Sequence, residues 1–277
     1  MTSIFDEILE VLRSGERGVL ATVVETHGSV PQSPGARMII LGDGRILGTV
    51  GGGALEHKVR AMAPDVQAAG APRLVSFELG GDLGMACGGS AKVFLEPLGR
   101  GDRLYVFGAG HIAEHLCELA SRCGFMVTVV DARDELRRPE RFPSAFALSP
   151  ACAANRLGEL DLAAHAGDAY VMVVTHSHDI DFSLVQALLP LGLPYLGMIG
   201  SRAKAAKLQQ ALKDAGVPED QRAKVRSPAG LPLGGRSPAE IAVSIVAELV
   251  QERSRRGEGS GSSASADPCT DRGSGSG

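Results

Sequence analysis

The first hundred residues carry a helical pattern of apolar positions followed by a series of strand-like runs. Residues 4–13 have an amphipathic helical period, and Ser3 and Asp6 are placed to cap its first turn. Short runs rich in apolar and β-branched residues then predict strands at residues 19–25, 37–41, 46–50, 73–79 and 91–98. A helix is expected from residue 54 to residue 62, because Pro64 should end it. The pattern indicates a small α+β unit.

Beyond residue 102 the pattern changes to strands that mostly alternate with helical stretches. The predicted strands cover residues 103–107, 126–130, 169–174 and 194–199. Such alternation is typical of a parallel sheet with crossover helices. Ser237 and Glu240 form a capping box around Pro238, which predicts a last helix with an apolar stripe facing the sheet.

These patterns predict an α/β chain with two domains and a tail. A small, glycine-rich N-terminal α+β domain is expected at residues 1–99, followed by a Rossmann-like parallel-sheet domain at residues 100–251. Residues 252–277 are expected to form a disordered tail. Glycine and serine dominate from Gly257 onward, and no periodic apolar residues remain there to offset the entropy of ordering.

The composition narrows the classes of partner. A chain of 277 residues with 44% apolar residues is long enough for two domains with proper cores. Its formal charge of -4, its 4% aromatic content and its lack of tryptophan disfavour a nucleic-acid or membrane-surface partner. No secretory signal or membrane-spanning run is evident, and the five cysteines lack zinc or redox spacing. We therefore expect a cytoplasmic protein.

Cys87 stands in a glycine frame that includes Gly88 and Gly89. Glycines on both sides let the backbone turn tightly and let a bulky partner approach the sulfur. The alternative is a buried cysteine that fills the core, since free cysteine is among the most buried residue types. The frame makes Cys87 a candidate binding residue.

A second glycine segment, Gly51, Gly52 and Gly53, leads from a predicted strand into a predicted helix. Its amides form a candidate nest for a phosphate or a polyanionic cofactor, although a purely structural turn is the alternative. Nucleotide hydrolysis is not expected, because Ala54 and Leu55 stand where a phosphate loop of that kind needs a lysine and a hydroxyl.

The second domain contains a dinucleotide-binding fingerprint. Gly108, Gly110 and Ala113 follow a predicted strand and open a predicted helix, and Asp131 ends the next strand, where a ribose-binding acid would lie. The same residues favour close helix–strand packing even when no nucleotide binds. The fingerprint therefore predicts a Rossmann-like sheet, with NAD(P) or another nucleotide as a candidate ligand.

Two further loops follow strands of this sheet and should share its carboxyl edge. Ser201 and Arg202 are candidates for holding an anion, or else for capping and solvating a helix. His176 and His178 superficially suggest a metal site, but Ile180 occupies the place where the matching motif of metallohydrolases needs an aspartate. A polar loop is the commoner explanation of these histidines.

Taken together, the segments resemble the xanthine dehydrogenase accessory protein family, XdhC/CoxI. The likeness runs in the expected order over about residues 5 to 251. The segments that carry it are residues 28–37, 48–56, 85–89, 108–113, 131–133, 175–181, 194–204 and 238–248.

The resemblance implies a cytoplasmic chaperone for the molybdenum cofactor. Such a protein binds the molybdenum–molybdopterin cofactor, holds it while a cysteine desulfurase replaces an oxo ligand by sulfur, and assists its insertion into xanthine dehydrogenase or a related molybdenum hydroxylase. It is an accessory factor and not itself the hydroxylase. In this setting Cys87 would face the cofactor as a candidate molybdenum ligand, because a thiolate is a soft ligand.

Two other functions remain open from the residues alone. An NAD(P)-dependent oxidoreductase would use Gly108, Gly110 and Asp131, but no Tyr-x-x-x-Lys pair is present to supply a general acid. A metal hydrolase would use His176 and His178. A homodimer is the default expectation for the oligomeric state.

Overall fold

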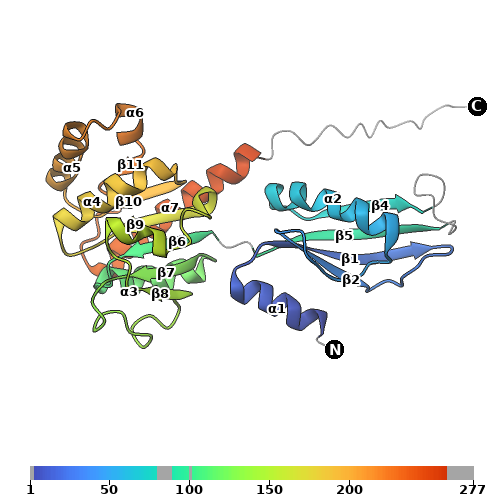
Figure 1. Ribbon diagram of the computed structural model, residues 1–277. Coiled ribbons are helices and arrows are strands. Elements are labelled where there is room, and N and C mark those ends of the chain that lie inside the picture. The colour runs from blue at the N-terminus through green and yellow to red at the C-terminus, as the bar shows by residue number, and fades with distance from the viewer. Residues whose placement is uncertain (1–2, 80–88, 100–101, 261–277) are drawn as a thin grey trace, which may run out of the picture. The chain divides into compact units, whose positions relative to one another are not determined.

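A computed structural model describes residues 3–79, 89–99 and 102–260, with side chains of the last helix described as far as Arg256. The chain divides into two compact units, one centred on Gly18–Leu98 and the other on Gly99–Arg253. Each unit has its own sheet, as Figure 1 shows. Within the described ranges, none of the helices combines the length and the apolar character that crossing a membrane requires.

The first unit is a five-stranded antiparallel sheet in the order β3-β2-β1-β5-β4. Its elements are β1 (Gly18–His27), β2 (Arg37–Leu41), β3 (Ile46–Gly48), α2 (Gly53–Ala69), β4 (Arg73–Glu78) and β5 (Ser90–Leu98). The helix α1 (Ile4–Ser14) is divided, since Ile4–Ile8 group with this unit and the residues from Leu9 group with the second. Ser3 and Asp6 cap the start of α1 as predicted: the Ser3 amide donates to the Asp6 carboxylate at 3.0 Å.

The helix α2 lies across one face of this sheet (Figure 1) and closes the core of the unit. Strand β5 alternates buried and half-buried residues, as a strand with one covered face does. The apolar stripe of α2 and the inward residues of the strands form one cluster, which includes Leu55, Val59, Ala63, Val66, Val19, Ala21, Val23, Met38, Ile40, Val93 and Leu95.

The expected end of α2 at Pro64 is wrong, because the helix continues through that residue to Ala69. Proline removes one backbone donor and crowds the preceding turn, but Pro64 lies on the exposed side of the helix. Ala63 and Val66 are buried against the sheet on the other side. Packing of that face therefore outweighs the local cost of the proline.

The second unit is a six-stranded parallel sheet in the order β11-β10-β9-β6-β7-β8. Its strands are β6 (Arg103–Phe107), β7 (Met126–Val130), β8 (Ala147–Ser149), β9 (Ala169–Val173), β10 (Tyr195–Met198) and β11 (Val225–Arg226). Its helices are α3 (His111–Arg122), α4 (His178–Leu188), α5 (Arg202–Asp214), α6 (Glu219–Arg222) and α7 (Pro238–Ser260), with 3-10 turns at Ala154–Glu159, Ala166–Asp168 and Leu189–Leu191. The predicted Rossmann-like sheet is confirmed.

Helices cover both faces of this sheet, which is why its central strands are apolar apart from Arg103 at the start of β6. Every residue of β6 and β9 is buried. On one face the sheet packs against α3 and α7, and on the other against α4 and α5. The sequence patterns did not predict the edge strands β8 and β11, and α7 continues to Ser260, beyond residue 252 where the tail was expected to begin.

The strand order reverses between β6 and β9, so the carboxyl ends of these two strands flank the switch point of the sheet. The loops that leave these ends lead to helices on opposite faces of the sheet, and ligands of α/β proteins of this type bind beside such loops. The loops 108–110 and 174–177 occupy these positions.

The two glycines of the first loop give a matched test of backbone packing. Gly108 has a φ of 113°, and a Cβ there would lie 2.6 Å from the carbonyl oxygen of Val174. At Gly110 φ is -81° and a Cβ would meet nothing within 4 Å. We expect Gly108→Ala to lower the free energy of unfolding by about 2–4 kcal/mol, and Gly110→Ala by about 1 kcal/mol or less. Urea unfolding of the two variants checks this, and equal losses would contradict it.

Candidate functional site

Two glycine segments of the first unit meet the loop 28–36 at one end of its sheet. A Cβ at Gly89 would lie 2.5 Å from the carbonyl oxygen of His27 and 2.6 Å from that of Ser29. A Cβ at Gly51 would lie 2.8 Å from Cγ of Pro31. Only glycine permits these approaches, since real Cβ atoms essentially never come so close. The structure therefore brings the triple-glycine loop and the end of the Cys87 segment to the same loop.

Much of the triple-glycine nest is occupied by the chain's own polar groups. One carboxylate oxygen of Glu56 accepts hydrogen bonds from the amides of Gly52 at 2.9 Å and Val50 at 3.3 Å, and from the hydroxyl of Thr49. The amide of Gly51 donates to the Thr49 hydroxyl at 3.1 Å. Glu56 thus holds the loop in shape and takes up donors that the sequence pattern assigned to a ligand.

The amides at the start of α2 are engaged differently. Gly52 is the N-cap of this helix and makes no side-chain cap hydrogen bond. The first amides of a helix have no partner within the helix, so those of Gly53 and Ala54 face solvent or a ligand. This end of α2 also carries the positive end of the helix dipole. The backbone amides of Gly53 and Ala54 are therefore the hydrogen-bond donors that this loop can offer to an anion.

Two predicted residues, Cys87 and Gly88, lie outside the described residues. Two cations of this sheet precede or follow these residues in the chain. Lys92 on β5 donates to Glu25 on the adjacent strand at 2.7 Å. Arg37 on β2 lies with its guanidinium carbon 5.1 Å from the centre of the Phe5 ring. Both cations are therefore engaged at the surface of the sheet.

The Rossmann fingerprint forms the geometry that its residues predicted. Gly108 packs against Val174 and the amide of Thr175, so the first loop touches the loop that follows β9. Ala113 is fully buried between α3 and the sheet. Gly110 caps α3 with open space around it, so its lack of a side chain has no packing cause among the described residues.

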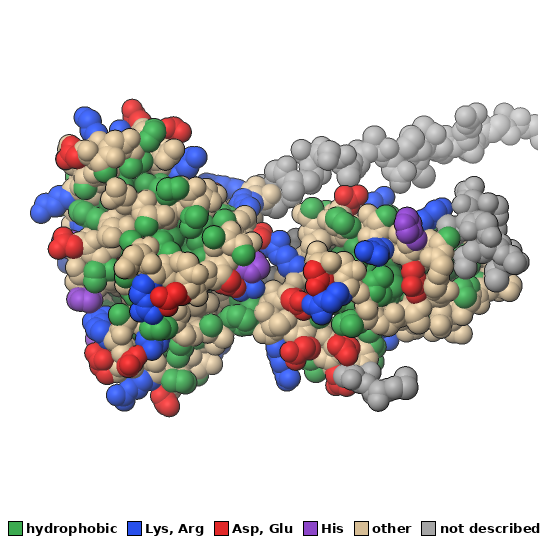
Figure 2. All heavy atoms as spheres, viewed as in Figure 1, with side chains coloured by type: hydrophobic (Ala, Val, Ile, Leu, Met, Phe, Trp, Pro, Cys, Tyr) green, Lys and Arg blue, Asp and Glu red, His purple; other side chains and the backbone are tan. Residues whose placement is uncertain are grey.

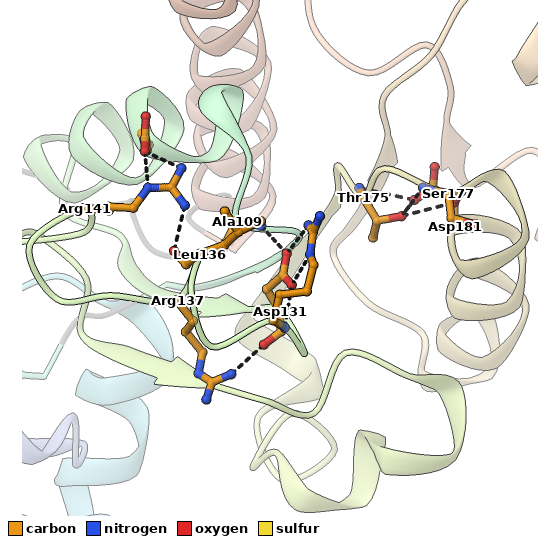
Figure 3. Close-up of polar contacts among 10 residues, drawn as sticks. Ala109, Asp131, Leu136, Arg137, Arg141, Thr175, Ser177 and Asp181 are labelled. Atoms are coloured by element: carbon orange, nitrogen blue, oxygen red, sulfur yellow. Dashed lines mark hydrogen bonds and ion pairs between the residues drawn. The ribbon is translucent and has the colours of Figure 1, made fainter.

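Asp131 is buried, and its carboxylate accepts four hydrogen bonds from the protein (Figure 3). Ala109 donates its amide at 2.8 Å, and Arg133 donates its amide at 3.0 Å and two guanidinium nitrogens at 2.9 and 2.7 Å. Burial alone would raise the pKa of Asp131, but these hydrogen bonds outweigh it and lower the pKa. Asp131, which the sequence pattern assigned to a ribose, is thus an ionised carboxylate that connects the loop after β6 with the loop after β7.

A buried ion pair, not singled out from the sequence, lies at the carboxyl edge. The Asp181 side chain is fully buried, and it pairs with the ammonium of Lys204 and accepts the Thr175 hydroxyl at 2.6 Å. The stem of Lys204 runs over Gly200, where a Cβ would lie 2.6 Å from its Cδ. The pair ties the start of α4 to the start of α5. The only sequence signal for it was a lysine and an aspartate near two helix starts.

Ser201 and Arg202 stand at the start of α5. The Ser201 hydroxyl accepts the amide of Lys204 at 3.2 Å, so it caps the helix. Arg202 is exposed. His176 and His178 are also exposed, and His178 stacks on Phe182 with ring centres 6.3 Å apart. Among the residues that the structure describes, no three His, Cys, Asp or Glu side chains gather in a way that could hold a metal ion.

The buried ion pair generates one prediction. Lys204→Met leaves the buried carboxylate of Asp181 without its cation, so we expect it to lower the free energy of unfolding by about 3–5 kcal/mol. Adding Asp181→Asn removes the unpaired charge, and the double variant should recover most of that loss. Denaturant unfolding of the two single variants and the double variant measures this. Strictly additive losses would show that the two groups are not coupled.

Thiol labelling gives a second prediction. Burial, together with the nearby Asp131, raises the pKa of Cys152 to about 11, and burial raises that of Cys117 to about 11. At pH 8 only about 0.1% of such a thiol is ionised, so both should react with iodoacetamide at least about a hundredfold more slowly than the exposed Cys123. Peptide mapping by mass spectrometry reads out each rate, and fast labelling of Cys152 would contradict the raised pKa of this half-buried thiol.

Comparison with known proteins gives matches over both units. A family model described as "XdhC and CoxI family" matches residues 11–78, and one described as "XdhC Rossmann domain" matches residues 104–249. The chain is 32% identical to the uncharacterized protein YqeB of Escherichia coli strain K12 over 254 residues, and 33% identical to a probable xanthine dehydrogenase subunit of Bacillus subtilis strain 168 over 166 residues. These alignments cover 90% and 60% of this chain, and 46% and 47% of those proteins, so the chain spans about half their length.

Two further proteins align with this chain over most of their own length. The molybdenum cofactor insertion chaperone PaoD of Escherichia coli strain K12 is 25% identical over 305 aligned positions, which cover 91% of this chain and 88% of PaoD. A crystal structure described as a xanthine dehydrogenase from Bacillus halodurans superposes with a TM-score of 0.50 at 25% identity, over 90% of this chain and 96% of that one. The Rossmann match alone spans more than half of the sequence, and the second family match lies in the other unit. The chain therefore belongs to the XdhC and CoxI family.

Proposed function

We propose that this protein binds the molybdenum cofactor as cargo, holds it for sulfuration and assists its insertion into a molybdenum hydroxylase related to xanthine dehydrogenase. The observation that carries the proposal is the meeting of glycine segments at one end of the first sheet, where Gly89 and Gly51 both pack on the loop 28–36. The similarity to a molybdenum cofactor insertion chaperone over 88% of its length supports it. The protein then acts as a maturation factor, with a hydroxylase and a cysteine desulfurase as its partners.

The first unit offers donors for the phosphate of this cargo. The amides of Gly53 and Ala54 at the uncapped start of α2 can receive an anion, while Glu56 keeps the preceding turn of the loop in place. Gly51 allows Pro31 to close over this loop. We propose that Cys87 contacts the molybdenum, since a thiolate is a soft ligand of the type that suits this metal centre.

A charge introduced at the start of α2 tests the phosphate contact. Ala54→Asp places a carboxylate where the phosphate should bind, yet it suits the helix dipole and should not destabilise the fold. We expect it to weaken retention of the cofactor at least about tenfold, the effect of losing one charge-assisted hydrogen bond. The matched variant Ala54→Asn has nearly the same shape without the charge, and it should stay close to the original protein.

Retention is measured by mixing purified protein with molybdenum cofactor released from a molybdoenzyme, followed by gel filtration, metal analysis and pterin fluorescence. Cys87→Ser should also reduce retention, with Cys123→Ser as its control, because Cys123 is an exposed thiol in the other unit. No retention by the unaltered protein would overturn the proposed function. Equal retention of the cofactor by Ala54→Asp and Ala54→Asn would show that the phosphate does not bind at the start of α2.

A further inference from the structure

The Rossmann unit departs from nucleotide-binding sheets at one position. In such sheets an acid at the end of the second strand binds the hydroxyls of a ribose. Asp131 occupies this place directly after β7, the second strand of the unit along the chain. Its surroundings differ from those of a ribose acid, since protein groups already surround its carboxylate (Figure 3).

The carboxylate of Asp131 has no acceptor position left. An ionised carboxylate offers about four lone-pair sites. Oδ1 accepts the amide and Nε of Arg133, at 3.0 and 2.9 Å, and Oδ2 accepts the amide of Ala109 at 2.8 Å and a terminal nitrogen of Arg133 at 2.7 Å. The Asp131 side chain is only 4% exposed. A ribose hydroxyl would therefore have to displace one of these donors.

That exchange is unfavourable because two of the four donors are guanidinium nitrogens that bind the carboxylate side by side. A neutral hydroxyl supplies neither the opposite charge nor this bidentate geometry. The surrounding turn is also held in place. Arg137 donates to the backbone carbonyl of Asp131 at 2.7 Å and to the carboxylate of Asp134 at 2.5 Å. Arg137 thus helps to hold the turn that carries Asp131 and Arg133.

We propose that Arg133 is a specificity-determining residue of the Rossmann unit: its guanidinium occupies the carboxylate of Asp131 and excludes ligands recognised through a ribose diol, the class to which NAD(H) belongs. The open approach at Gly110 remains available to ligands that present no diol to Asp131. This inference concerns the second unit and does not depend on cofactor binding by the first.

The test is a gain of binding by NADH. We expect the unaltered protein to bind NADH only in the millimolar range, by calorimetry and by NADH fluorescence anisotropy. Arg133→Ala frees two acceptor sites of Asp131, so it should bind NADH at least about tenfold more tightly, as one charged hydrogen bond allows. NADPH should gain nothing, because the freed carboxylate repels its 2′-phosphate. Arg137→Ala is the matched control, since the hydrogen bond of Arg137 to Asp131 goes to the backbone carbonyl and its other guanidinium contact is the carboxylate of Asp134.

Two results would overturn the inference. One is a folded Arg133→Ala variant that binds NADH no better than the Arg137→Ala control. The other is tight NADH binding by the unaltered protein that Asp131→Asn abolishes, because Asp131 would then already serve the ribose. The comparison of the unaltered protein with Asp131→Asn does not use Arg133→Ala, so it tests the inference even when that variant fails to fold. As a further control, adding Asp131→Asn to Arg133→Ala should abolish the tighter NADH binding.

Discussion

Close approach of one backbone segment to another, at positions that only glycine allows, is the constraint on which both units depend. Gly89 brings the start of β5 against the carbonyls of His27 and Ser29, and Gly108 brings the turn after β6 against Val174 and Thr175. A methyl group at either position would fall well inside van der Waals distance of backbone atoms, which cannot move aside as a flexible side chain can. These contacts set the spacing of the loops that carry the candidate binding groups.

Internal carboxylates then occupy the donors that these loops expose. Glu56 takes up amides of the triple-glycine loop, Asp131 joins the turns after β6 and β7, and Asp181 joins the starts of α4 and α5. Each is satisfied by several donors, which offsets the cost of removing a charge from water. These contacts hold the loops in shape, and what the loops offer to a ligand is restricted to the remaining groups, such as the first amides of α2 and the open side of Gly110. On the face shown in Figure 2, acidic and basic side chains are interspersed, so recognition by this face rests on local contacts more than on a broad field.

Strands with continuous buried runs were predicted to the residue or to within one residue at each end, as at β9 and β10, and marginal elements were not. The bounds of β2, β6 and β7 agree with the apolar runs, because a continuous run of buried residues is a strong local signal. The strands β8 and β11 have three and two residues, and such short edge strands leave almost no pattern. Pro64 was a local stop signal that burial of α2 overrode, and α7 continues into the glycine-containing stretch as far as Ser260.

The sequence by itself determined the α/β class, the Rossmann fingerprint around Gly108, Gly110 and Ala113, and the resemblance to the family that the comparisons confirm. These features are local in the chain, so residue type and spacing are enough to specify them. Only the tertiary structure decided which partner each polar group takes. Lys204 pairs with Asp181 across 23 positions of the chain, and the carboxylate of Asp131 accepts hydrogen bonds from Ala109 and Arg133. Hydrogen bonds depend on direction and distance between groups that folding brings together, and the order of residues does not contain them.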